Sequence, residues 1–285
     1  MDQDKNSMLE KIFTQALQNH QNNNLQEAQN YYQKVLKIDP SHSQVLNNLA
    51  VIFTDLKEYQ KAKDCYKKAI ESDPNYADAH NNLGVVFKDL GENQKAKDCY
   101  IKAIELNPNH SSAHYNLGNI FKELGEDQKA KDSYEKAIEI NPNYSNAYNN
   151  LGIIFKELGD SQKAKYFYEK AIELNPNYID AHNNLAIIFR ELGEPHNAKN
   201  CYEKVLKIDP NNINSINALS DLFRSYKFDY KSKDNKTSFK KLIISLFNKD
   251  IETSFIYENA KSILFSDGVQ NQLEEAINSD SLLSN

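Results

Sequence analysis

The most restrictive feature of the sequence is a repeat of 34 residues. Six of the seven prolines mark it, since each follows the last by 34 residues: Pro40, Pro74, Pro108, Pro142, Pro176 and Pro210. The repeats span 9–42, 43–76, 77–110, 111–144, 145–178 and 179–212, and half a repeat follows at 213–226. We number them repeats 1 to 6. Tandem units of this length predict a stack in which each repeat packs against its neighbours.

Each repeat predicts two helices joined by a turn. In 111–144, apolar residues such as Leu117 and Phe121 recur at steps of three and four, as one face of a helix requires. Gly125 ends this first helix, and the acidic pair that follows favours the start of the second. Pro142 ends the second helix, because proline disfavours a helical residue before it. The expected fold is all-α.

The same columns of the repeat alternate small and large side chains. Position 8 is small, and position 20 is always alanine, so paired helices can approach closely: Ala50, Gly84, Gly118, Gly152 and Ala186 at position 8. Aromatic residues occupy position 11, which is phenylalanine from repeat 2 onward, and position 24, which is always tyrosine: Tyr32, Tyr66, Tyr100, Tyr134, Tyr168 and Tyr202. These large side chains are expected to fill the gaps that the small ones leave.

This pattern resembles the tetratricopeptide repeat, which has Leu-Gly at positions 7 and 8, aromatics at 11 and 24, alanines at 20 and 27 and proline at 32. The resemblance covers 9–226 and implies a right-handed superhelical solenoid whose first helices line a concave face. Position 4 departs from the family's usual tryptophan, with histidine, leucine or tyrosine instead. Repeat 1 lacks the Leu-Gly pair, so we interpret it as a polar cap or a degenerate repeat.

Composition narrows the class of protein further. The net charge of −6 argues against binding of the whole chain to the phosphates of a nucleic acid. No apolar run is long enough to cross a membrane. The acidic N-terminal tail, 1–8, does not have the pattern of a secretory signal. Three widely spaced cysteines, Cys65, Cys99 and Cys201, favour reduced thiols over a disulfide framework. We therefore expect a cytoplasmic protein with no nucleic-acid partner and no membrane insertion.

The family resemblance places the candidate binding residues at positions 2, 5, 6, 9, 12 and 13 of the first helices. Asparagine dominates positions 5 and 6 and also occurs once at position 9: Asn81, Asn149 and Asn183 at position 5; Asn48, Asn82, Asn116, Asn150 and Asn184 at position 6; Asn119 at position 9. Cations occupy position 12 in four repeats: Lys88, Lys122, Lys156 and Arg190. Position 13 is acidic from Asp55 through Glu191.

A column of asparagines suits the recognition of an extended peptide. Each side-chain amide carries both donors and acceptors, so it can pair with a backbone regardless of sequence. The first helices of successive repeats lie about 10 Å apart, and an extended peptide advances about 3.3 Å per residue. One asparagine in each repeat would therefore contact about every third residue of the bound peptide. The column resembles the asparagine ladder of the O-linked N-acetylglucosamine transferases. A second interpretation is that these asparagines hydrogen-bond within the fold, as they can elsewhere in the family.

The cation column also has two interpretations. Lys88, Lys122, Lys156 and Arg190 would favour an acidic partner if they faced the bound segment. The neighbouring acidic column allows the alternative that both form a solvated surface of mixed charge. Position 2 carries no cation, so the carboxylate clamp of chaperone-tail binders is not expected.

No catalytic constellation is recognisable, and the prediction is a protein that is not an enzyme and needs no cofactor or metal. His80, His114 and His182 share position 4, but successive repeats stand too far apart for two rings to reach one ion. The cysteines share position 23 with other residue types, which favours packing over nucleophilic chemistry. Phosphate-binding glycine loops and the nucleophile elbow are absent from the sequence.

After residue 226 the repeat pattern ends. Residues 227–237 read as a basic linker, and 238–285 as short helices that either cap the stack or begin a further domain. We therefore expect an interaction scaffold or adaptor that holds an extended protein segment in a concave groove. Two alternatives stay open: the substrate-selecting arm of a larger glycosyltransferase or methyltransferase, and a self-associating spacer. The oligomeric state is left undetermined by the sequence.

Overall fold

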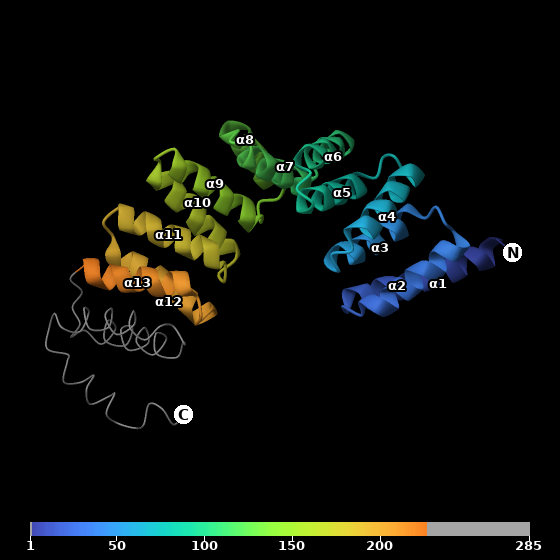
Figure 1. Cartoon of the computed structure of the whole chain (residues 1–285), viewed down its shortest axis with the longest axis horizontal. Helices are drawn as coiled ribbons and strands as arrows, with labels where there is room; N and C mark the ends of the chain where they lie inside the picture. The colour runs from blue at the N-terminus through green and yellow to red at the C-terminus, as the bar shows by residue number, and fades with distance from the viewer. Residues whose placement is uncertain (1, 227–285) are drawn as a thin grey trace, which may run out of the picture. The chain divides into compact units, whose positions relative to one another are not determined.

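A computed structural model of the protein describes residues 2–226, which form thirteen α-helices and no strand (Figure 1). The first helices of the repeats, with the half repeat last, are α1 (Asp2–Gln21), α3 (Ser43–Asp55), α5 (Ala77–Asp89), α7 (Ser111–Glu123), α9 (Ser145–Glu157), α11 (Ile179–Glu191) and α13 (Ile213–Ser225). The second helices are α2 (Leu25–Ile38), α4 (Tyr59–Ser72), α6 (Asn93–Leu106), α8 (Asp127–Ile140), α10 (Ser161–Leu174) and α12 (Pro195–Ile208).

The structure confirms the all-α solenoid of paired helices. α7 ends two residues before Gly125, and this glycine adopts the left-handed φ of 72° that lets the chain reverse into α8. One boundary differs from the prediction, because α1 begins at Asp2 and the expected tail is therefore helical. The predicted linker and the helical segment at 227–285 lie outside the described residues.

The chain divides into two compact units, and the boundary between them lies between residues 147 and 148. The first unit contains α1 to α8, and the second contains most of α9 and then α10 to α13. Helices that follow one another in sequence pack together from α1 to α8 in the first unit and from α10 to α13 in the second.

The column of tyrosines at position 24 forms the centre of the packing. Their rings are at most 2% exposed. In repeat 4, a methyl group placed on Gly118 would lie 2.6 Å from the ring of Tyr134, and one placed on Gly84 would lie at the same distance from the ring of Tyr100. Glycine at position 8 of repeats 3, 4 and 5 therefore lets the tyrosine ring of the same repeat lie directly on the backbone of the first helix.

The segment Gln-Lys-Ala-Lys, which recurs at 94–97, 128–131 and 162–165, also has a packing role. The Nζ atoms of Lys97 and Lys129 lie 5.1 and 5.5 Å from the ring centroid of Phe121. One lysine comes from the preceding repeat and the other from the same repeat, so the pair brackets the ring at the junction. Such contacts contribute about 0.5–1 kcal/mol each when exposed to solvent, so the motif helps to hold successive repeats together.

Candidate functional site

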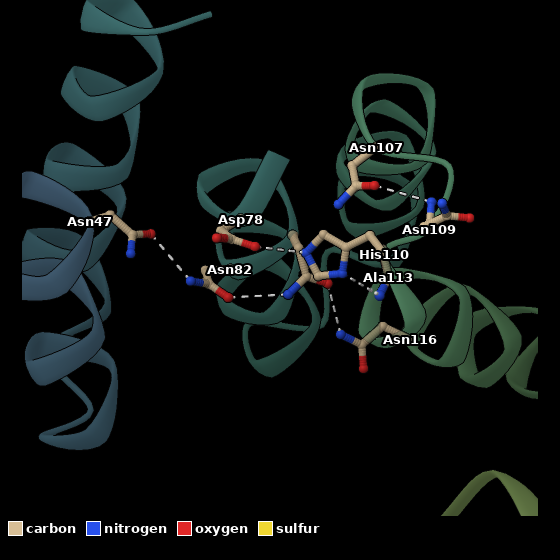
Figure 2. A network of polar contacts seen from close by, with 9 residues as sticks. Asn47, Asp78, Asn82, Asn107, Asn109, His110, Ala113 and Asn116 are labelled. Carbon is tan, nitrogen blue, oxygen red and sulfur yellow. Dashed lines mark hydrogen bonds and ion pairs between the residues drawn. The ribbon is translucent and has the colours of Figure 1, made fainter. Parts of the chain in front are cut away.

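The asparagines at positions 5 and 6 of the first unit form a continuous hydrogen-bonded network. Asn82 Nδ2 donates to Asn47 Oδ1 of the preceding repeat at 3.2 Å, and Asn116 Nδ2 donates to Asn81 Oδ1 at 3.0 Å. Within each repeat, position 5 donates to position 6: Asn47 to Asn48 at 3.3 Å and Asn81 to Asn82 at 3.1 Å. Figure 2 shows the bond between Asn47 and Asn82 and the position of Asn116 on the next helix.

The two asparagine positions differ in exposure. Asn47 and Asn81 are 5% and 6% exposed, whereas Asn48, Asn82 and Asn116 are only partly buried. The position-5 side chains therefore stabilise the network from its buried side, and the position-6 side chains form its solvent-facing side. We call the surface formed by Asn48, Asn82 and Asn116 on α3, α5 and α7 the first asparagine face.

A tyrosine takes the place of the position-5 amide in repeat 4. Tyr115 packs against Tyr144 with ring centroids 4.8 Å apart. Asn119, the asparagine predicted at position 9 of this repeat, accepts a hydrogen bond from the Tyr134 hydroxyl at 2.8 Å. Asn119 therefore bonds to the core tyrosine of its own repeat.

The second unit repeats the arrangement. Asn184 Nδ2 donates to Asn149 Oδ1 at 3.1 Å, and Asn149 donates to Asn150 at 3.3 Å. The half repeat has alanine at position 6, and Ser215 supplies the missing bond by donating to Asn183 Oδ1 at 2.8 Å. The sequence gave no signal for this serine, because it stands at position 3, where the other repeats from 2 onward carry valine or alanine.

The cations at position 12 are engaged to different degrees. Lys88 Nζ lies 3.3 Å from Glu123 of the next repeat, and Lys122 Nζ lies 3.0 Å from Asp127. Arg190 donates a hydrogen bond to the Tyr202 hydroxyl. Lys156, in the second unit, has no ion pair among the residues that the structure describes. The cation column is thus partly committed to contacts within the fold.

A histidine–aspartate contact at the edge of the first asparagine face was not predicted from the sequence. His110 Nε2 lies 3.1 Å from Asp78 Oδ1, while His110 Nδ1 accepts a hydrogen bond from the backbone of Ala113 at the start of α7 (Figure 2). The hydrogen bond from His110 holds the pKa of Asp78 below its ordinary value. His110 stands at position 34, where most of the other repeats carry tyrosine, so the repeat pattern gives no signal for its contact with Asp78.

The histidines at position 4 connect successive repeats. The Nε2 atoms of His80, His114 and His182 lie 3.4, 3.0 and 3.0 Å from the carbonyl oxygens of Pro74, Pro108 and Pro176. Each ring therefore donates to the loop that precedes its own helix. This contact gives the histidine column a structural role.

These histidines make stability depend on pH. Burial lowers the pKa of His80, His114 and His182 from 6.5, so the folded chain keeps them neutral while the unfolded chain takes up protons near that value. Their contribution is complete above the unfolded pKa and is lost as the pH falls through 6.5. We expect the urea midpoint to fall between about pH 7.5 and about pH 5.5. A variant with tyrosine at all three positions, as at Tyr148, should show a flatter profile, whereas an equally steep one would contradict this origin.

The described residues give little support for a reactive thiol, a metal site or a membrane-spanning helix. Burial raises the pKa of Cys99 to about 11 and that of Cys201 to about 12, so both thiols stay protonated at neutral pH. Within 2–226 there is no group of three or more histidine, cysteine or acidic side chains that would hold a metal ion. None of the helices in that range combines the length and the apolar character needed to cross a membrane.

Comparison with protein families gives one consistent result. The tetratricopeptide repeat model matches residues 77–110, 111–144, 145–178 and 179–212. Related tetratricopeptide models match 14–42, 31–64 and 52–91, so the matches together span 14–212 without a gap. The matched models describe repeats and indicate no enzyme family. Among curated proteins, no sequence matches the chain significantly.

Solved structures show the same fold. The chain is similar to PilF of Pseudomonas aeruginosa, with a TM-score of 0.69 and 20% identity over 76% of this chain and 99% of that one. It is also similar to MamA, with a TM-score of 0.51 and 27% identity over 57% and 95% of the two chains. YrrB, a TPR protein with an unusual peptide-binding site, gives a TM-score of 0.52 and 22% identity over 66% and 96%. By its repeats and by its fold, the chain belongs to the tetratricopeptide repeat family.

Proposed function

We propose that the chain is a non-enzymatic interaction scaffold that binds an extended segment of a partner protein on the first asparagine face or on the corresponding surface of the second unit, formed by Asn150 and Asn184. The observation that carries this proposal is the orientation of the position-6 amides. Asn82 uses one N–H and one oxygen lone pair within the network, because it donates to Asn47 and accepts from Asn81. A side-chain amide has two of each, so one donor and one acceptor remain for a ligand.

The network also fixes these amides before a ligand arrives. A side chain that is already held in one orientation loses less conformational entropy on binding, which raises the affinity that its hydrogen bonds can deliver. Internal hydrogen bonding and peptide binding are therefore compatible uses of the same asparagines. The resemblance of the column to the transferase ladder, and the peptide-binding site of the similar protein YrrB, support this proposal by analogy.

The two units differ in the charge that we propose for the bound partner, because their position-12 cations have different contacts. Lys156 and Arg190 keep the expected preference for an acidic side chain in the second unit. In the first unit, Lys88 and Lys122 are paired with carboxylates, so their contribution to an acidic preference is reduced. The transferase-arm and spacer alternatives stay predictions, since no contact among the described residues favours either.

The experiment is a selection from a displayed library of random twelve-residue peptides on the immobilised full chain, followed by affinity measurements on the selected peptides. We expect Asn82→Ala together with Asn116→Ala to weaken binding by about tenfold or more, since each lost hydrogen bond is worth on the order of 1 kcal/mol. Circular dichroism of both proteins shows whether the variant keeps its helices.

The matched control is Asn75→Ala together with Asn109→Ala. These two asparagines are exposed at position 33 of repeats 2 and 3, and their side chains donate to nothing among the described residues. Selected peptides should bind this control as they bind the wild type. Equal losses in both variants, or no loss in either, would refute the proposed face.

A further inference from the structure

Asp78 lies beside the first asparagine face as an exposed carboxylate. It stands at position 2 of repeat 3, one helical turn before Asn82 on α5, so the two side chains share one side of that helix. Figure 2 shows the Asp78 carboxylate next to the Asn82 amide. The Asp78 side chain is 63% exposed, so a ligand on this face has access to it.

The contact with His110 holds this carboxylate without neutralising it. His110 Nε2 lies 3.1 Å from Asp78 Oδ1, and the histidine side chain is only 11% exposed. Because His110 Nδ1 accepts a hydrogen bond from the Ala113 N–H, it carries no proton, and the ring is the neutral tautomer with its proton on Nε2. The full negative charge therefore stays on Asp78, and within residues 2–226 its Oδ2 has no hydrogen-bond partner or ion pair.

This carboxylate gives the first asparagine face one negative charge in a fixed register. In the two repeats beside it, position 2 is uncharged: Gln44 and Ser112. Repeat 6 also has an aspartate at position 2, Asp180, but position 34 there is Asn212, whose amide donates to Asp209 instead. The combination of an exposed aspartate and a buried histidine that holds it is therefore particular to repeat 3.

We infer that the first asparagine face binds a segment that carries an arginine or lysine, and that this side chain docks on the Asp78 carboxylate while Asn82 pairs with the segment's backbone. The inference rests on the proposed function and names the partner chemistry of that site. Residues four apart on a helix have Cβ atoms about 5–6 Å apart, which an arginine or lysine side chain spans.

The contact proposed is a charge-assisted hydrogen bond. An N–H of the ligand cation donates to Asp78 Oδ2, while Oδ1 keeps its contact with His110. Because the histidine already holds the carboxylate in place, little conformational entropy of Asp78 is lost when the cation binds.

The peptide selection on the full chain tests the inference with different variants. Selected peptides that lose affinity on the Asn82→Ala, Asn116→Ala variant bind the first asparagine face, and these should be enriched in arginine or lysine at one position. Replacing that residue by neutral citrulline in a synthetic peptide should weaken binding to the wild-type chain by about fivefold, as expected for a partly exposed ion pair. On the Asp78→Asn variant, the same replacement should alter affinity by less than about twofold.

Two controls separate this effect from general electrostatics and from misfolding. Asp98→Asn removes the same charge from an exposed position on α6 of the same repeat and should leave the effect of citrulline unchanged. The citrulline peptide makes no ion pair, so it should bind Asp78→Asn as tightly as the wild type. If Asp78→Asn loses both peptides through misfolding, Asp78→Ser, which carries the residue found at position 2 of repeat 4, gives the same comparison.

Failure of the inference differs from failure of the proposed function. Peptides that depend on Asn82 and Asn116 but show no basic preference would overturn the inference and leave the proposed function standing. An effect of citrulline that persists on Asp78→Asn would do the same. If no selected peptide loses affinity on the Asn82→Ala, Asn116→Ala variant, the first asparagine face is not the binding site, and both are overturned.

Discussion

Replacement of Tyr134 by alanine is expected to lower the free energy of unfolding by about 3–5 kcal/mol, the range for large aromatic-to-alanine changes in cores. The ring is 1% exposed and lies directly on Gly118. Its removal leaves a cavity between α7 and α8 and deprives Asn119 of the hydrogen bond from the hydroxyl. Urea denaturation of the full chain at neutral pH measures the loss.

Two comparisons test the origin of this loss. Tyr134→Phe keeps the ring and removes only the hydroxyl, so it should cost about 1 kcal/mol. Tyr166→Ala removes an aromatic side chain that is 52% exposed and should therefore cost much less than Tyr134→Ala. Amide exchange should accelerate most in α7, α8 and their neighbours, because each repeat contacts only adjacent ones. A loss below 1 kcal/mol for Tyr134→Ala would contradict the packing account.

Replacement of Asn81 by alanine is expected to lower the free energy of unfolding by about 2 kcal/mol, because it removes two hydrogen bonds that are each worth about 1 kcal/mol. Asn81 donates to Asn82 and accepts from Asn116. It is 6% exposed, so it has almost no surface to offer a peptide. Peptide affinity should nevertheless fall severalfold, since the amides of Asn82 and Asn116 lose their fixed orientation.

The control for this positioning role is Asn75→Ala, because Asn75 is exposed in the loop before α5. This substitution should change neither the free energy of unfolding nor the free energy of peptide binding by more than about 0.5 kcal/mol. Stability is read from urea denaturation and affinity from fluorescence anisotropy of a labelled selected peptide. If Asn81→Ala lowers stability but leaves peptide affinity unchanged, Asn81 is structural alone and does not position the face.

The fold was largely predictable because its determinants are local and repeated. Turn glycines such as Gly125, the prolines and the small residues at positions 8 and 20 act within one repeat or between neighbours, so their spacing alone specified the helical hairpins. The start of α1 was not predicted, since residues 2–7 are all polar and lack the apolar column that marks the other helices.

The site was predictable as a set of columns but not as a set of contacts. The sequence placed positions 5 and 6 together on one face, whereas packing buries Asn47 and Asn81 and leaves the position-6 asparagines partly exposed. Whether a lysine faces a ligand depends on the next repeat, as the Lys88–Glu123 pair shows. The buried Tyr100 hydroxyl has no hydrogen-bond partner among the described residues, although position 24 is tyrosine in every repeat, so its column alone does not predict the missing partner.

The central claim is that the position-6 amides contact a bound peptide backbone. The most direct measurement is the nuclear magnetic resonance spectrum of asparagine side-chain amides, selectively labelled with nitrogen-15, during titration with a selected peptide. We predict that the Nδ2 resonances of Asn82 and Asn116 shift and saturate, while those of Asn75 and Asn109 stay in place. Saturable binding in which the Asn82 and Asn116 resonances do not move would contradict the account.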